Sequence, residues 1–222
     1  MDWARTAGHF EGVNPVEGVE KGLAKQKDRV THHAAMPWGE VPGFLPELGE
    51  SVAALTLRFL ILTAARTGEV IGARWSEIDT GERLWTIPAD RMKAKREHRV
   101  PLSDDALAVL ERVRGLDAEI VFPGQKRGRG LSNMAMTQLM RRLGHGDVTV
   151  HGMRSSFRDW AEERGGMPRE IAELSLAHEV GNATERAYRR SDLLDKRRDL
   201  MGRWARFCCP ASADVIEIGG RA

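Results

Sequence analysis

The chain has 222 residues, enough for one domain with a sizeable core, and its 41% hydrophobic and 30% charged content is ordinary for a globular protein. No window approaches the roughly 18 consecutive apolar residues of a membrane span, and the N-terminus lacks a signal-peptide pattern. The two cysteines, Cys208 and Cys209, are adjacent, a spacing that suits neither a disulfide framework nor a zinc site. We expect a cytoplasmic protein that uses no metal and no cofactor.

The basic residues are clustered, although the net charge is only +2. Residues 91–99 hold five basic side chains against one acidic side chain, and Lys126, Arg127 and Arg129 lie among glycines. Such local basicity favours a polyanionic partner more than the total charge does. Either cluster alone is equally compatible with solvated surface charge.

The N-terminal residues, 1 to about 33, are polar, rich in glycine and weakly periodic, which is typical of a boundary or linker. A helix is predicted after Ser51, which can cap it, with an apolar face that runs from Val52 to Leu62. Gly68 is expected to end or bend this helix, and Arg66 lies just before that break. An arginine there could simply satisfy the helix C-terminus.

Two short segments, 84–87 and 99–102, have the composition of strands and predict a small antiparallel sheet. The basic connection between them would present Lys93 or Lys95 outward. Ser103 predicts the start of a further helix, and Ser132 or Asn133 predicts another, which carries the apolar stripe 136–143. The expected fold class is therefore mostly α with a small antiparallel β-sheet.

The segment 151–188 concentrates chemically versatile side chains. His151 and Arg154 are three apart in a helical pattern, so their side chains should share one face. A general base and a phosphate-binding guanidinium could then act on one target. His178 follows helical sequence opened by Pro168, and Tyr188, the only tyrosine, ends a short run further on. Each of these residues alone would more often have a purely structural role.

A last helix is predicted to start near Ser191 or Asp192. It would carry Leu200, Met201 and Trp204 toward a partner surface. A short β-like run, 215–218, follows in the C-terminal tail.

The order His-x-x-Arg, then Leu-x-His, then Tyr resembles the tyrosine recombinase family of phage and prophage integrases. Upstream, TAARTGEVIGARWSEID resembles the family's first arginine motif, and MKAKREHRVPLS resembles its β-hairpin lysine motif. The resemblance implies an integrase catalytic domain at residues 34–210. It also implies that residues 1–33 are the remnant of a preceding core-binding domain with its linker, and that 211–222 form a tail.

The resemblance also implies a function. It is site-specific recombination of double-stranded DNA through a covalent 3′-phosphotyrosyl intermediate, in integration or excision of a prophage or other mobile element. The expected partners are DNA attachment sites and further copies of the protein, as a tetramer on DNA, with no membrane. Glu69 is expected to orient neighbouring groups, and Lys95 competes with Lys93 as general acid. The catalytic residues implied are Arg66, Lys93, His151, Arg154, His178 and Tyr188.

Two other functions remain compatible with parts of the pattern. A type IB topoisomerase shares this chemistry but relaxes DNA at one site, whereas a recombinase exchanges strands between two sites. A DNA-binding regulator could keep the fold without the reaction. The complete set of catalytic residues argues against the regulator, because binding alone does not require every member.

Overall fold

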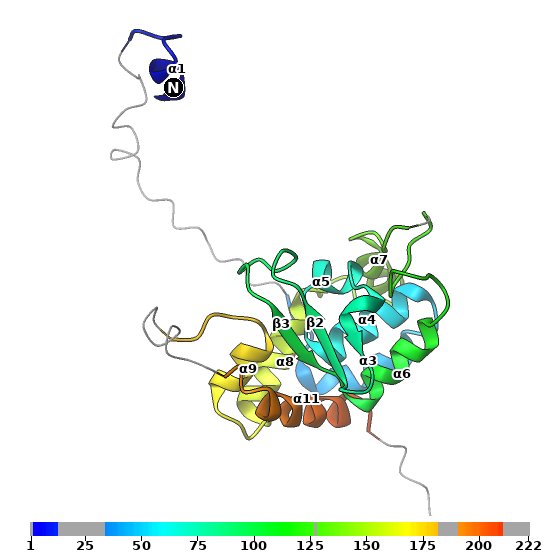
Figure 1. Cartoon of the computed structure of the whole chain (residues 1–222). Coiled ribbons are helices and arrows are strands. Elements are labelled where there is room, and N and C mark those ends of the chain that lie inside the picture. Colours follow the sequence, from blue (N-terminus) through cyan, green and yellow to red (C-terminus); the bar gives the residue numbers. More distant parts are fainter. Residues whose placement is uncertain (1, 13–33, 127, 182–190, 211–222) are drawn as a thin grey trace, which may run out of the picture. The chain divides into compact units, whose positions relative to one another are not determined.

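The protein is described by a computed structural model over residues 2–12, 34–126, 128–181 and 191–210 (Figure 1). The chain divides into two units, Met1–His32 and His33–Ala222. The described part of the first unit contains helix α1 (Asp2–Thr6), and the rings of Trp3 and His9 lie 5.7 Å apart there. That this unit is the remnant of a core-binding domain stays a prediction.

Helix α4 (Val52–Thr63) is the centre of the second unit. Most of its residues are buried, which is typical of a helix that is apolar on nearly every side. The predicted cap is confirmed, since the Ser51 hydroxyl accepts a hydrogen bond from the Ala54 amide at 3.2 Å. On the sheet side, the Phe59 ring lies 5.5 Å from the Trp85 ring.

Helices cover much of α4, and α11 runs along one side of the domain (Figure 1). Ser103 caps α6 as predicted, by accepting from the Ala106 amide at 3.2 Å. The other helical elements of the described part are η1 (Trp38–Glu40), α3 (Val41–Glu47), α5 (Thr67–Ile71), η2 (Trp75–Glu77), α6 (Asp104–Val113), α7 (Ala135–Arg142), α8 (Gly152–Glu163), α9 (Arg169–Ser175) and α11 (Leu194–Cys208).

The sheet is antiparallel, with the order β1-β2-β3. Its strands are β1 (Ile78–Asp79), β2 (Leu84–Ile87) and β3 (His98–Pro101). The register places Ile87 opposite His98. The two predicted strands are thus present, with β3 beginning one residue earlier than expected, and β1 was not predicted. The expected fold class, mostly α with a small antiparallel sheet, is confirmed.

Three predicted helix boundaries, one end and two starts, were wrong. Helix α4 ends at Thr63, because Ala64 adopts a left-handed conformation with φ 50°, and Gly68 lies inside α5. Helix α7 begins at Ala135 with no side-chain cap from residues 132 or 133. Helix α11 begins at Leu194, after the left-handed Leu193. Short-range capping patterns predict the caps of α4 and α6. They do not predict these three boundaries, where a left-handed residue or a helix start without a side-chain cap occurs.

The buried face of α11 does not point to a partner surface, contrary to expectation. Leu200, Met201 and Trp204 are buried in the core of their own domain. The Trp204 indole donates to the Ile61 carbonyl oxygen at 2.8 Å, and its ring lies 5.0 Å from the Trp160 ring. Helix α11 therefore closes the core around α4.

Candidate active site

Arg66 occupies the N-cap position of α5, where the chain turns after α4. Its backbone amide donates to Glu69 Oε2 at 2.8 Å, and its Nη1 donates to Glu69 Oε1 at 2.7 Å. Its Nη2 donates to the Ala177 carbonyl oxygen at 3.3 Å. Glu69 is buried, so it fixes both the backbone and the guanidinium of Arg66, which agrees with the orienting role expected for it.

Arg154 reaches the same place from α8. Its side chain donates through Nη1 to the Ala64 carbonyl oxygen and through Nη2 to the Leu176 carbonyl oxygen, the latter at 2.8 Å. Burial, together with the positive charge of Arg66, lowers the pKa of Arg154 to about 10. Arg154 therefore stays cationic at neutral pH, although it is only 5% exposed.

His178 lies just beyond α9, after the left-handed Ala177. Its ring Nδ1 is 2.6 Å from Glu173 Oε2, and its Nε2 is 3.3 Å from Arg154 Nη2. The main chain supports this placement, because the His178 amide donates to the Glu173 carbonyl oxygen at 2.9 Å. Arg66, Arg154 and His178 thus come from three separate parts of the sequence and form one connected group.

Glu173 is held between positive charges from two helices. Arg158 Nε of α8 lies 3.1 Å from its Oε1, and Arg169 Nε lies 3.5 Å from the same oxygen. Burial by itself would raise the pKa of Glu173. The hydrogen bond with His178 and the charge of Arg158 outweigh burial and lower that pKa, so Glu173 is a carboxylate at neutral pH.

The two lysine candidates lie in the connection between β2 and β3, and both are exposed. Lys95 has a left-handed backbone with φ 53°, and its ammonium group donates to the Asp90 carbonyl oxygen at 3.4 Å. The structure does not bring either ammonium group into the network of Arg66, Arg154 and His178 described above. The choice of Lys93 over Lys95 stays a prediction.

His151 is the N-cap residue of α8, and its carbonyl oxygen accepts from the Arg154 amide at 3.1 Å. The His151 side chain is exposed, whereas that of Arg154 is buried. The two residues are therefore adjacent through the backbone but differ in their environment. Tyr188 lies outside the described residues.

The chain beyond Tyr188 is anchored again at Asp192. Its Oδ2 lies 3.5 Å from Arg99 Nη1 and 3.4 Å from Arg197 Nη1. The buried Arg197 also donates to the Arg99 carbonyl oxygen. This ion-paired group ties the start of α11 to β3.

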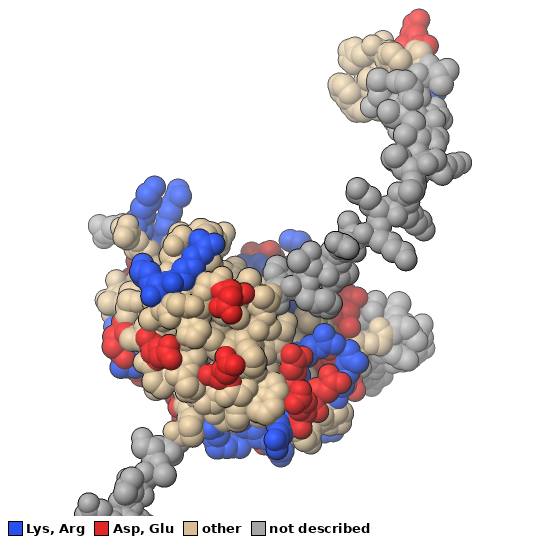
Figure 2. All heavy atoms as spheres, turned by 180° about the vertical axis from the view of Figure 1, so that it is seen from behind, with Lys and Arg blue, Asp and Glu red and all other residues tan. Residues whose placement is uncertain are grey.

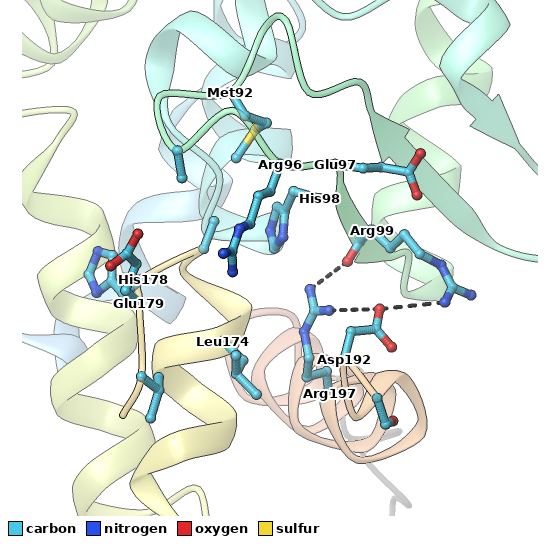
Figure 3. Close-up of a pocket in the computed structure, with 14 residues that line it drawn as sticks. Met92, Arg96, Glu97, His98, Arg99, Leu174, His178, Glu179, Asp192 and Arg197 are labelled. Atoms are coloured by element: carbon cyan, nitrogen blue, oxygen red, sulfur yellow. Dashed lines mark hydrogen bonds and ion pairs between the residues drawn. The ribbon is translucent and has the colours of Figure 1, made fainter. Parts of the chain in front are cut away.

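A pocket of about 600 Å³ separates this anchor from His178. Figure 3 shows Arg96 and His98 on its hairpin side, His178 on the side of α9, and Asp192 with Arg197 on the side of α11. The pocket is lined by charged side chains of both signs, and His178 of the candidate catalytic set is among the lining residues. The charged side chains in this lining suit a charged or phosphate-bearing group better than an apolar ligand.

Buried His98 was not expected to take part in this arrangement. Burial, followed by the positive charges of Arg197 and Arg66, lowers its pKa to about 3, although a hydrogen bond to the backbone of Ser175 acts in the opposite direction. His98 is therefore neutral at pH 7. Its hydrogen bond to Ser175 connects β3 with the end of α9, and His178 follows that end in the chain.

Sequence reasoning also missed Glu173 and Arg91. Glu173 precedes His178 by five residues, and a carboxylate about one helical turn before a functional histidine is a signal that could have identified it. Arg91 contacts Glu77 and Glu69, which are distant enough in the sequence that no local pattern indicates the contact.

Within residues 2–12, 34–126, 128–181 and 191–210, no helix has the length and apolar content needed to cross a membrane. In the same part of the chain, no three His, Cys, Asp or Glu side chains are grouped so that they could hold a metal ion.

The sequence matches the phage integrase family over residues 47–193. Prophage integrase IntA of Escherichia coli (strain K12) is 35% identical over 214 residues, which cover 93% of this chain and 52% of the relative. The integrase of Enterobacteria phage P4 is 31% identical over 217 residues, which cover 87% of this chain and 49% of the relative. The chain thus spans about half the length of the curated relatives it matches.

Solved structures share the fold. The integrase from mycobacterium phage Brujita superposes with a TM-score of 0.62 at 20% identity, over 95% of this chain and 70% of that one. A lambda integrase dimer bound to a COC′ core site gives 0.56 at 18% identity, over 81% and 67%. The fold is therefore that of a tyrosine recombinase catalytic domain. The chain belongs to the phage integrase family.

Proposed function

We propose that this chain is the catalytic part of a site-specific recombinase that cuts and rejoins double-stranded DNA, in integration or excision of a prophage or other mobile element. The convergence of Arg66, Arg154 and His178 carries the proposal. Backbone carbonyl oxygens of Ala64, Leu176 and Ala177 hold the two guanidinium groups beside the histidine ring.

The two arginines suit the charge of a phosphodiester that is under attack. Each guanidinium has five N–H donors, and the contacts described above use only some of them. The remaining donors can bind non-bridging oxygens in pairs and stabilise the five-coordinate transition state. Because the arginines supply this positive charge, the reaction does not require a metal ion.

We assign the remaining roles so that the protons balance. The Tyr188 oxygen attacks phosphorus and forms the phosphotyrosyl bond, while the bond from phosphorus to the 5′ oxygen breaks. His151 accepts the tyrosine proton, and Lys93 donates a proton to the departing 5′ oxygen. The reverse steps rejoin the strand, because the phosphotyrosyl bond conserves the energy of the broken bond.

We assign DNA attachment sites and further copies of the protein as partners. The lambda integrase crystal structures are described as a dimer on a core site and as a tetramer on a Holliday junction, which supports both assignments. We also assign residues 1–33 to the end of a core-binding domain and its connector, and we place the reaction on DNA in the bacterial cytoplasm.

Charge distribution supports a restricted DNA-binding surface. The face in Figure 2 mixes Asp and Glu with Lys and Arg and leaves wide uncharged areas between them, so it does not offer a continuous basic surface. The basic segment 91–99, by contrast, which runs from the β2–β3 connection into β3, contributes Arg96, Glu97, His98 and Arg99 to the pocket that His178 also lines (Figure 3). We therefore place the DNA on the side of that connection.

The decisive experiment is covalent trapping on nicked DNA that contains an attachment site. The wild-type chain should give an adduct that resists SDS, whereas Tyr188→Phe should still bind DNA but give none. An adduct that persists in Tyr188→Phe would overturn the assignment of the nucleophile. Adding a second attachment site separates recombination, which exchanges strands, from relaxation at a single site.

A further inference from the structure

Glu173 holds the catalytic candidate His178 by one particular ring nitrogen. An ionised carboxylate can only accept hydrogen bonds, so at 2.6 Å from Glu173 Oε2 the Nδ1 atom must carry a hydrogen. The ring is thereby oriented with Nε2 toward the guanidinium of Arg154. Nε2 is therefore the nitrogen that is available to a phosphate held by the arginines.

The contact with Arg154 determines the protonation of Nε2 when no phosphate is present. A guanidinium has only donors, so Arg154 Nη2, at 3.3 Å, can hydrogen-bond to Nε2 only if Nε2 bears a lone pair. With the hydrogen on Nδ1, this contact fits the neutral form of the ring. In an imidazolium, Nε2 would carry a hydrogen, and this N–H group would face an N–H group of Arg154.

A bound phosphate reverses this requirement. Phosphate oxygens accept hydrogen bonds, so a contact with Nε2 requires a hydrogen on Nε2, while Nδ1 already carries one for Glu173. His178 must therefore gain one proton from solvent and become an imidazolium. The new positive charge then lies between the carboxylate of Glu173 and the negative phosphate, and both stabilise it.

Of the other charged groups around the ring, some stabilise a positive charge on His178 and others oppose it. Arg154 of α8 and Arg66 of α5 oppose the new charge until a phosphate neutralises them. Arg158 and Arg169 weaken the effect of Glu173, since both contact its Oε1. Across the pocket, the hairpin supplies Arg96, Glu97 and His98, α11 supplies Asp192 and Arg197, and Glu179 follows His178 in the chain. Among these groups, Glu173 is a carboxylate hydrogen-bonded to the ring itself, at 2.6 Å from Nδ1.

We propose that Glu173 is a positioning residue that orients His178 through Nδ1 and couples phosphate binding at Nε2 to the uptake of one proton. This inference rests on the proposed function. It adds a proton-linked step to DNA binding at this site, with the proton taken from solvent and held on His178 until the phosphate leaves.

The first test measures the ring of His178 directly. The full chain is labelled with ¹⁵N-histidine, and the His178 signal among the seven histidines is identified by its loss in His178→Gln. In the free wild-type chain Nδ1 should be protonated and Nε2 not. When the Tyr188→Phe chain binds nicked DNA, both nitrogens should be protonated. A free chain with its hydrogen on Nε2, or no change on DNA binding, would overturn the proposal.

The second test compares adduct formation across pH for wild type, Glu173→Gln and Glu173→Ala. We expect Glu173→Ala to slow single-turnover cleavage about 10- to 100-fold and to move its alkaline loss of activity to lower pH. Glu173→Gln can still accept from Nδ1 through its amide oxygen, so it should lose less but show the same shift in pH. Glu162→Gln, the same change at an exposed position of α8, should match wild type.

These outcomes separate the inference from the function on which it rests. Equal pH profiles for wild type and both Glu173 variants would overturn the role of Glu173 while adduct formation still supports a recombinase. If the wild-type chain forms no adduct on any nicked site, the proposed reaction fails. The histidine spectra then still decide whether Glu173 fixes the ring. Glu173→Gln, which is close in shape to the native residue, serves if Glu173→Ala fails to fold.

Discussion

The Arg91 guanidinium donates a hydrogen bond to the Glu69 carbonyl oxygen at 2.6 Å, and it thereby ties the lysine-bearing connection to α5, the helix whose N-cap is Arg66. The same guanidinium forms an ion pair with Glu77, whose carboxylate also accepts from the Trp85 indole at 3.0 Å. Two candidate catalytic elements that are separate in the sequence are therefore joined by one partly buried polar group.

Arg91→Met should destabilise the domain, because it leaves the Glu77 carboxylate, whose side chain is 7% exposed, without its ion-pair partner. Loss of one partner from a buried pair costs about 3–5 kcal/mol. We expect the lower end of this range, because Arg91 is partly exposed in the native protein and the Trp85 indole still donates to Glu77 in the variant. Urea unfolding measures the change. Arg74→Met is the control, because its ion pair with Glu119 is exposed and should contribute less than about 1 kcal/mol. Similar losses in both variants would contradict the structural role of Arg91.

Arg66→Lys and Arg154→Lys should each reduce DNA cleavage about 100-fold or more while they weaken DNA binding only slightly. Both changes retain the positive charge but remove the paired N–H donors that reach carbonyl and phosphate oxygens together. Single-turnover adduct formation and fluorescence anisotropy measure the two effects. Arg142→Lys, at an exposed position of α7, should change neither. Equal losses of binding and cleavage would assign the two arginines to docking.

Lys93→Ala should cleave poorly when the leaving group is an ordinary 5′ oxygen and should recover when sulfur replaces that oxygen. The sulfur leaving group has a lower pKa and needs no proton from a general acid. Adduct formation on paired oxygen and sulfur substrates measures this rescue. If Lys95→Ala shows the rescue and Lys93→Ala does not, the general acid is Lys95.

Stability should fall as the pH is lowered through the region where free histidine titrates. Since the pKa of His98 is about 3 in the folded protein and near 6.5 in an unfolded chain, the unfolded state binds the extra proton between these values. The stabilisation that comes from neutral His98 is complete above pH 6.5 and is lost progressively toward pH 3. Between pH 7 and pH 5 the loss is about 2 kcal/mol. Urea unfolding at each pH measures it, and His98→Gln should remove this part of the dependence; an unchanged slope would contradict the assignment.

Replacement of Lys126, Arg127 and Arg129 by alanine should weaken DNA binding at low salt and flatten its dependence on salt. The slope of log K against log[salt] is negative, and each phosphate contact that is lost makes it less steep by about 0.9. Cleavage of DNA that is already bound should stay near the wild-type rate. A salt dependence that is unchanged in the triple variant would show that this loop does not contact DNA phosphates.

Local patterns predicted the parts of the fold that depend on neighbouring residues. Ser51 and Ser103 cap their helices because a hydroxyl and an amide three residues later are sufficient for that hydrogen bond. The two strands were predicted from composition at 84–87 and 99–102, and the structure has them at 84–87 and 98–101. The orienting role of Glu69 was also expected, and the contact with Arg66 that carries it spans only three residues.

Contacts between distant segments were beyond such patterns. The apolar sequence of α4 continues through Ala64 and Ala65, and no glycine marks the turn at Ala64. The hydrogen bond from Arg154 to the Ala64 carbonyl oxygen spans 90 residues and exists only in the folded chain. The burial of His98 depends in the same way on Arg197, almost 100 residues away, and on the end of α9.

The left-handed residues Ala64 and Ala177 have a consequence for how this site tolerates sequence change. Their carbonyl oxygens, with that of Leu176, are main-chain atoms, so mutation of these side chains does not remove the acceptors that hold Arg66 and Arg154. What mutation can change is the backbone path. A left-handed residue with a β-branched side chain is strongly disfavoured, whereas glycine adopts that conformation freely. The architecture therefore admits sequence drift at both positions among small residues and restricts it against valine, isoleucine and threonine.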